Sequence, residues 1–206
     1  MNAGLSNLAT LKAFLLPASL RSGTDDDATI TAVGLGVAGL IEGYCGRAFQ
    51  RTVGAADVFA ADRAQFLLSR FPVESVSKFE LKSTEAAGFV EQTLATYPRA
   101  IDLANGIVTL SGDAGDYFEQ LRITYTGGYW WDTSEDSSGS LPSGATALPK
   151  ALQLAWLMQC QHVWSALDKV GAALAEAPGK ATALDTLKLS PAVEQMLADF
   201  IRPNWT

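Results

Sequence analysis

Apolar residues near the start of the chain recur at spacings of three and four, which is the pattern of amphipathic helices. The segment LATLKAFL has apolar positions at Leu8, Leu11 and Leu15, so it predicts a short first helix. A second and longer helical pattern follows it. We therefore expect residues 1–49 to form the N-terminal helices of a helical core.

The second predicted helix begins after a run of three aspartates. Thr24 and Asp27 have the spacing of an N-terminal capping pair, and acidic residues suit the positive end of a helix dipole. The apolar positions that follow are Ile30, Val33, Val37, Leu40, Ile41 and Tyr44. This pattern predicts one continuous helix that ends near Arg47.

The middle of the chain, residues 50–131, has a different periodicity. Short apolar segments are separated by turn dipeptides such as Asn105-Gly106 and Ser111-Gly112. In LRITYT, at residues 121–126, apolar and polar side chains alternate with a period of two, as in a half-buried strand. We expect an antiparallel β module.

Helical patterns return after the β module. Residues 132–148 read as an acidic, Gly/Ser-rich loop, and residues 149–175 as a long core helix. Residues 176–206 read as a linker and a C-terminal helix, with Ser190 as its N-cap and Pro191 at its first position. The expected fold class is α+β, a helical bundle core with an inserted antiparallel β module.

The second predicted helix contains GLGVAG at residues 34–39, which matches the G-x-G-x-x-G of dinucleotide-binding turns. That turn requires a buried parallel strand before it and strand–helix alternation after it, and this sequence has neither pattern. The small residues recur at spacings of four and three, on one side of a helix: Ala32, Gly36, Gly39 and Gly43. We interpret them as a surface for packing against another helix, in the same chain or in a neighbouring subunit.

The chain is acidic, with 15 basic and 22 acidic residues and a net charge of −7. Proteins that bind nucleic acid tightly neutralise phosphates with basic residues, so tight binding is not expected here. Cys45 and Cys160 are isolated, and His162 lacks a carboxylate or cysteine at metal-ligand spacing, which favours a structural, buried histidine. We expect no catalytic, metal or cofactor site.

The N-terminus has no basic leader, and Thr10 and Lys12 interrupt its apolar stretch. No uninterrupted apolar run reaches the ~20 residues of a membrane span. The expectation is a protein made in a reducing cytoplasm, with no membrane partner.

The order of these segments resembles the head–tail connector (adaptor) proteins of long-tailed double-stranded DNA phages. The resemblance covers about residues 5 to 170. Its motifs are the short helix LATLKAFL, the DDD of residues 25–27, Tyr44-Cys45-Gly46-Arg47, FPVESVSKFEL at 71–81, the passage from Tyr97 to Leu110, ITYTGGY at 123–129, and a helix that starts after Pro149. The glycine content of the second helix and the length of the acidic loop depart from the family pattern.

The resemblance implies a structural virion protein with no enzymatic activity. It would form a homo-oligomeric ring of twelve copies, dock on the portal protein at the head–tail junction, and bridge the capsid to a tail, stopper or terminator protein. Double-stranded DNA would pass through the ring without specific binding, and twelve copies at −7 each would carry −84. Assembly would take place in the host cytoplasm. Two alternatives stay open: another neck or tail ring component (a stopper or tail terminator), and a dinucleotide-binding enzyme that uses residues 34–39.

The resemblance also implies roles for one group of acidic residues and one group of apolar residues. Asp132, Glu135 and Asp136 are candidates for charge that faces the ring lumen or the tail, although a simply solvated loop explains them equally well. Phe200, Ile201 and Trp205 are candidate anchors to the portal. The alternative for the last helix is that it packs on its own chain.

Overall fold

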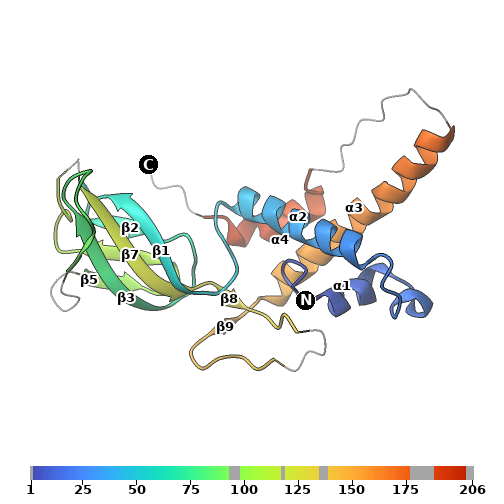
Figure 1. Cartoon of the computed structure of the whole chain (residues 1–206), viewed down its shortest axis with the longest axis horizontal. Coiled ribbons are helices and arrows are strands. Elements are labelled where there is room, and N and C mark those ends of the chain that lie inside the picture. The colour runs from blue at the N-terminus through green and yellow to red at the C-terminus, as the bar shows by residue number, and fades with distance from the viewer. Residues whose placement is uncertain (1, 93–97, 117–118, 135–138, 177–187, 203–206) are drawn as a thin grey trace. The chain divides into compact units, whose positions relative to one another are not determined.

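The computed structural model describes residues 2–92, 98–116, 119–134, 139–176 and 188–202. The chain divides into two compact units, which are described separately (Figure 1). The helical unit comprises residues 1–47, 131–141 and 148–206, and the β unit comprises residues 48–130 and 142–147. Helices together with antiparallel sheets confirm the predicted α+β class.

Four α-helices and two short 3-10 turns account for the regular structure of the helical unit's described part. They are α1 (Leu8–Leu15), η1 (Ala18–Leu20), α2 (Asp27–Cys45), α3 (Lys150–Glu176), α4 (Pro191–Leu197) and η3 (Ala198–Phe200). The continuous helix predicted from the apolar spacing is confirmed as α2, and the 34–39 glycine tract lies inside it. The helix ends where Gly46 adopts the left-handed conformation, with φ at 65°.

The start of α2 differs from the expectation. No side chain caps this end, so the predicted capping role of Thr24 and Asp27 is wrong. Asp27 instead accepts a hydrogen bond from the Lys12 ammonium, with Nζ and Oδ1 2.5 Å apart. The Lys12 side chain is largely buried, and it also donates to the Gly23 carbonyl. Helix α1 thus fixes the entry to α2 through one buried cation.

At Gly34, the backbone of α2 closely approaches the backbone of the N-terminal segment. A Cβ at Gly34 would stand 2.1 Å from the Ala3 carbonyl oxygen and 2.8 Å from Leu11 Cδ2. Trp156, fully buried on α3, donates from its indole nitrogen to the Gly34 carbonyl at 2.9 Å. Gly4, with φ at +122°, makes the reciprocal approach, because a Cβ there would stand 2.5 Å from the Gly34 oxygen.

Helix α4 packs on α3 of its own chain. Its Val193 and Leu197 are fully buried. Gln159 of α3 is also fully buried, and its amide donates to the Lys188 carbonyl and accepts from the Ser190 N–H. The predicted Ser190 N-cap and the proline at the first helical position are both confirmed.

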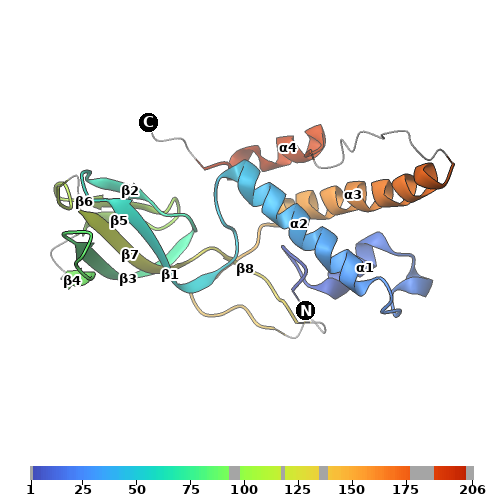
Figure 2. The same ribbon diagram turned by 45° about the horizontal axis from the view of Figure 1, so that its top comes forward.

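The described residues of the β unit form three sheets. The strands are β1 (Thr52–Ala60), β2 (Gln65–Leu67), β3 (Val73–Lys82), β4 (Val90–Gln92), β5 (Pro98–Asp102), β6 (Ile107–Leu110), β7 (Gln120–Gly127), β8 (Tyr129–Trp130) and β9 (Thr146–Ala147). One sheet has the order β1-β7-β3-β4 and a second the order β2-β6-β5, both antiparallel (Figure 2). Strands β8 and β9 form a parallel pair.

The core of the β unit follows from alternation along its strands. Leu121, Ile123 and Tyr125 of β7 are fully buried, while Arg122 and Thr124 between them are partly exposed, as the period-two pattern predicted. Side chains from both antiparallel sheets complete this core: Ala61, Phe66, Leu68, Phe71, Val73, Phe79, Val108, Leu110 and Ala114. The β unit therefore has an apolar core of its own.

The two classes of glycine in α2 give a matched test. Gly34→Ala should lower the free energy of unfolding by about 2 kcal/mol or more, because the added methyl overlaps the Ala3 backbone. Gly36→Ala should raise it by about 0.5–1 kcal/mol, because no described atom lies within 4 Å of the new Cβ and alanine is the better helix former. Urea denaturation followed by circular dichroism measures both; equal effects would contradict the packing described.

Candidate functional site

The outward side of α2 carries the small residues singled out from the sequence. Ala32, Gly36, Gly39 and Gly43 are all exposed. Among the described residues, no atom lies within 4 Å of a Cβ built on any of the three glycines. Packing inside the chain occurs instead at Gly34, which lies on the buried side with Ile30 and Ile41. For Ala32, Gly36, Gly39 and Gly43, packing against a neighbouring subunit stays a prediction.

A groove of about 530 Å³ lies between α2 and the start of α4. Gly39 and Gly43 form part of its floor because they have no side chains to fill it. The other lining residues are Leu40 and Tyr44 of α2 and Lys188, Leu189, Pro191 and Glu194 of the α4 segment. Apolar groups thus line the groove, with one cation and one carboxylate on the α4 side.

Helix α2 is unusually apolar for its exposure. Its length and composition would allow it to cross a bilayer, with a mean hydropathy of 1.4, yet only 33% of that window is buried. Such a helix near an N-terminus is weak evidence for a membrane span, since core helices have the same composition. Leu35 and Tyr44 are 49% and 41% exposed. Helix α2 thus leaves apolar side chains exposed as well as its small residues.

The acidic loop is only partly described. The carboxylate of Asp132 accepts hydrogen bonds from the backbone N–H groups of Ser134, at 2.8 Å, and Gly139, at 3.3 Å. Asp132 therefore organises the backbone of this loop. Glu135 and Asp136 lie outside the described residues.

The C-terminal segment combines anchored and exposed parts. The backbone N–H of Arg202 donates to the Cys45 carbonyl at 2.7 Å, which ties the end of η3 to the end of α2. Phe200 is half-buried and Ile201 is 44% exposed. Trp205 lies outside the described residues. Because α4 packs on α3, the exposed candidate contact among the described residues of this group is Ile201.

A partly buried polar cluster in the β unit escaped the sequence analysis. Asp57 of β1 accepts from the Tyr125 hydroxyl at 2.8 Å and from the backbone and side chain of Ser69. The Tyr125 hydroxyl also accepts from the Arg70 N–H at 3.1 Å. Burial raises the pKa of Tyr125 to about 12, so the hydroxyl stays protonated. The cluster joins β1, β7 and the segment after β2, which is a structural role.

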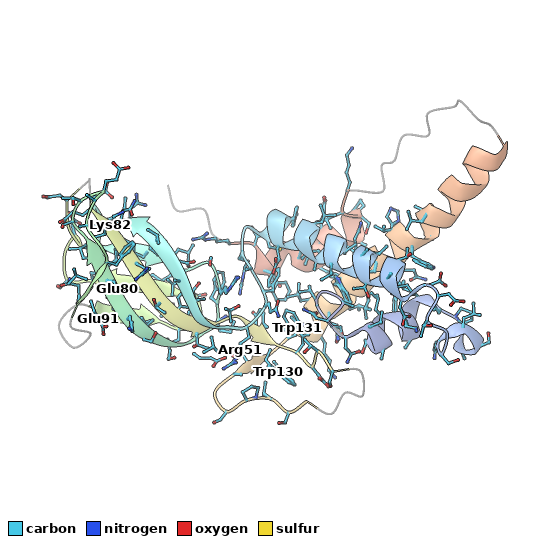
Figure 3. All side chains as sticks on the ribbon, viewed as in Figure 1. Arg51, Glu80, Lys82, Glu91, Trp130 and Trp131 are labelled. Carbon is cyan, nitrogen blue, oxygen red and sulfur yellow. The ribbon has the colours of Figure 1, made fainter. Side chains whose placement is uncertain are left out.

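Two ion pairs lie on the outer face of the four-stranded sheet. Arg122 makes two hydrogen bonds to Glu80, at 2.6 and 2.7 Å, and its guanidinium lies 4.1 Å from the centre of the Phe89 ring. The bonds from Arg122 lower the pKa of the Glu80 carboxyl. Lys78 pairs with Glu91 at 3.4 Å (Figure 3 labels Glu80 and Glu91). Paired exposed charges add little stability, and they leave this face without a strong field of one sign.

The structure places His162 and the 34–39 glycine tract in surroundings that bear on two predictions from the sequence. His162 is exposed on α3, so the predicted buried structural histidine is wrong, because its turn of the helix points away from the core. Residues 34–39 are helical, so they do not form the strand-to-helix turn that cradles a pyrophosphate. Within the described ranges, no three His, Cys, Asp or Glu side chains are grouped to hold a metal ion.

No protein-family model matches the sequence, and no curated protein matches it. Solved structures do resemble it. A chain from the neck of an empty GTA particle, computed with C6 symmetry, aligns with a TM-score of 0.57 at 18% identity. Chains from the virion of a native gene transfer agent (GTA) particle and from the neck of a native GTA particle, computed with C12 symmetry, align with TM-scores of 0.58 and 0.53 at 15% identity. Each alignment covers 97% of this chain and 90% of the other, and the shared property is the fold.

Both cysteines should be unreactive in the folded protein. Burial raises the pKa of Cys45 to about 11 and raises that of Cys160 further, so thiolate is scarce at pH 8. A thiol-reactive chromogenic disulfide at pH 8 should therefore label neither thiol in buffer and both in urea. Rapid labelling of the native protein would contradict this burial.

The two thiols also make stability depend on pH. Unfolded cysteine has a pKa of about 8.5, so the contribution of the Cys45 thiol to stability is intact below that pH and declines as pH rises toward about 11.

Proposed function

We propose that this protein is a structural subunit of the neck of a phage-like particle, an adaptor ring that docks on the portal and bridges the capsid to the tail. The observation that carries the proposal is the fold likeness to chains of GTA necks and virion over 97% of the sequence. The likeness spans both units of the chain. It agrees with the family indicated independently by the ordered sequence motifs.

The proposed ring has twelve copies, and it belongs to the virion. The similar necks were computed with C6 and C12 symmetry, which supports a cyclic assembly. Rings of this kind use heterologous contacts, in which one surface of a subunit meets a different surface of the next. The exposed small-residue side of α2, which includes Ala32, Gly36, Gly39 and Gly43, is the proposed subunit contact.

The proposed role requires passage of DNA and no catalysis. A net charge of −7 per subunit disfavours adhesion of double-stranded DNA to the ring, because like charges repel. The acidic loop with Asp132, Glu135 and Asp136 is the proposed source of lumen-facing or tail-facing charge. A helical GLGVAG tract supports a structural role over a dinucleotide-binding one. A stopper or tail terminator is the second candidate, since it would share the ring and the acidic charge.

Imaging tests the ring directly. The full chain, alone and with the portal protein of the same particle, should give closed rings by negative-stain electron microscopy. Twelve copies of 21.8 kDa correspond to about 262 kDa of this chain in mass photometry. Monomers in both samples, over a range of concentrations, would reject the proposal.

The proposed portal contact is the end of the chain, with Phe200, Ile201 and Trp205. Ile201→Asp should weaken portal pull-down by about tenfold or more, because a charge would replace a 44% exposed apolar side chain at the contact. Truncation after Arg202 should also weaken docking, and it retains the tie from Arg202 to Cys45. Leu103→Asp, at an equally exposed position in the β unit, is the control and should dock normally. Full docking by the Ile201 variant would remove this residue from the contact.

A further inference from the structure

The uncovered side of α2 has the chemistry of an interior surface. Between Asp27 and Glu42 the helix contains no charged residue. Surface helices ordinarily carry charged side chains on the solvent side, and helices apolar all round are buried. The groove beside Gly39 and Gly43 is the concave part of this side. It therefore has the shape and the composition to receive an apolar side chain.

Helix α3 has an apolar stripe that could pack against an apolar groove. From Ala151 to Leu167 it also contains no charged residue. Its core-facing residues, such as Trp156 and Cys160, are fully buried, and the same side continues through half-buried Val163 to Leu167, which is 43% exposed. The far end of α3 runs past α2 and α4 in both views (Figures 1 and 2). The apolar stripe of α3 is thus longer than the surface that covers it.

The exposed end of this stripe cannot fill the groove of its own chain. Gln159 of α3 hydrogen-bonds to Lys188 and Ser190, and Lys188 lines the groove. The groove therefore lies near Gln159 along the axis of α3. Leu167 is eight residues further on, which is about 12 Å along the helix axis at about 1.5 Å per residue. A second copy of the chain can supply the stripe instead.

We propose that the stripe at Val163 and Leu167 of one copy packs into the α2–α4 groove of the next copy. The inference rests on the proposed ring and specifies its contact. Two different surfaces of each subunit meet, so the contact is heterologous and repeats around a closed ring. The absence of side chains at Gly39 and Gly43 lets the incoming helix approach closely, with Leu167 as the knob and the groove as the hole.

Disulfide trapping between singly substituted copies tests the contact. Gly39→Cys and Leu167→Cys variants are purified separately, mixed, assembled as rings and oxidised mildly. The two native cysteines are buried, so they do not compete. We expect crosslinked dimers in the mixture and none in either variant alone. Leu154→Cys is the matched control, because Leu154 is 44% exposed but lies about 140° around α3 from Leu167. It should give no crosslink with Gly39→Cys.

The outcomes separate this contact from the function it rests on. Rings without crosslinks in the mixture would overturn the contact and leave the neck proposal standing. A crosslink in Gly39→Cys alone would also overturn it, since that result requires a two-fold contact between α2 helices. Failure of the unsubstituted chain to form rings, both alone and with the portal protein, would overturn the neck proposal itself. Flotation of the full chain with phosphatidylcholine vesicles would assign the α2 surface to a membrane and overturn the contact.

Noncovalent variants provide a second readout. Gly39→Leu should fill the groove and weaken ring assembly by about tenfold or more. It should not lower the melting temperature, because no atom of the described part of the chain lies within 4 Å of the new Cβ. Leu167→Asp should weaken assembly comparably, whereas Leu154→Asp should leave it unchanged. Equal effects of the two leucine substitutions would contradict the assignment of this stripe.

Discussion

The helical unit depends on the approach of the Ala3–Gly4 backbone to Gly34. No side chain separates the two segments, and the Gly34 carbonyl accepts the indole N–H of Trp156 at the same point. The N-terminal segment, α2 and α3 therefore meet around one residue. Any larger side chain at Gly34 would displace backbone, which cannot move aside as a flexible side chain can. This contact fixes which side of α2 is buried and, as a consequence, which side is left exposed.

The exposed glycines acquire their meaning from that arrangement. Gly36, Gly39 and Gly43 have no close neighbour among the described residues, and each costs about 0.5–1 kcal/mol of helix stability relative to alanine. Three such positions cost about 1.5–3 kcal/mol in the monomer. A contact with another subunit would offset this cost, because close approach of helices increases the dispersion and burial gained. The groove beside α4 gives that contact a defined place.

The β unit follows a different principle. Its stability comes from an apolar core between two antiparallel sheets and from the Asp57–Tyr125 cluster, and its outer charges are largely matched in pairs. Exposed apolar side chains occur in both units, but the long uncharged stretches of the sequence are those of α2 and α3. In the proposed neck ring, the helices form the subunit contact.

The sequence determined the elements and the class of the fold. The spacing of apolar residues predicted α2, and their alternation predicted the strand β7. The Ser190-Pro191 pair predicted the start of α4. Each of these signals depends on neighbours within a few residues. The partners of each surface were decided by the tertiary structure: Gly34 as the packed glycine, Lys12 as the partner of Asp27, the exposure of His162, and the union of Asp57 with Tyr125. Residues 15 to 122 positions apart meet in the Lys12, Asp57 and Trp156 contacts. Local spacing defines the side of a helix on which a residue lies, but the crossing of distant segments decides what that side contacts.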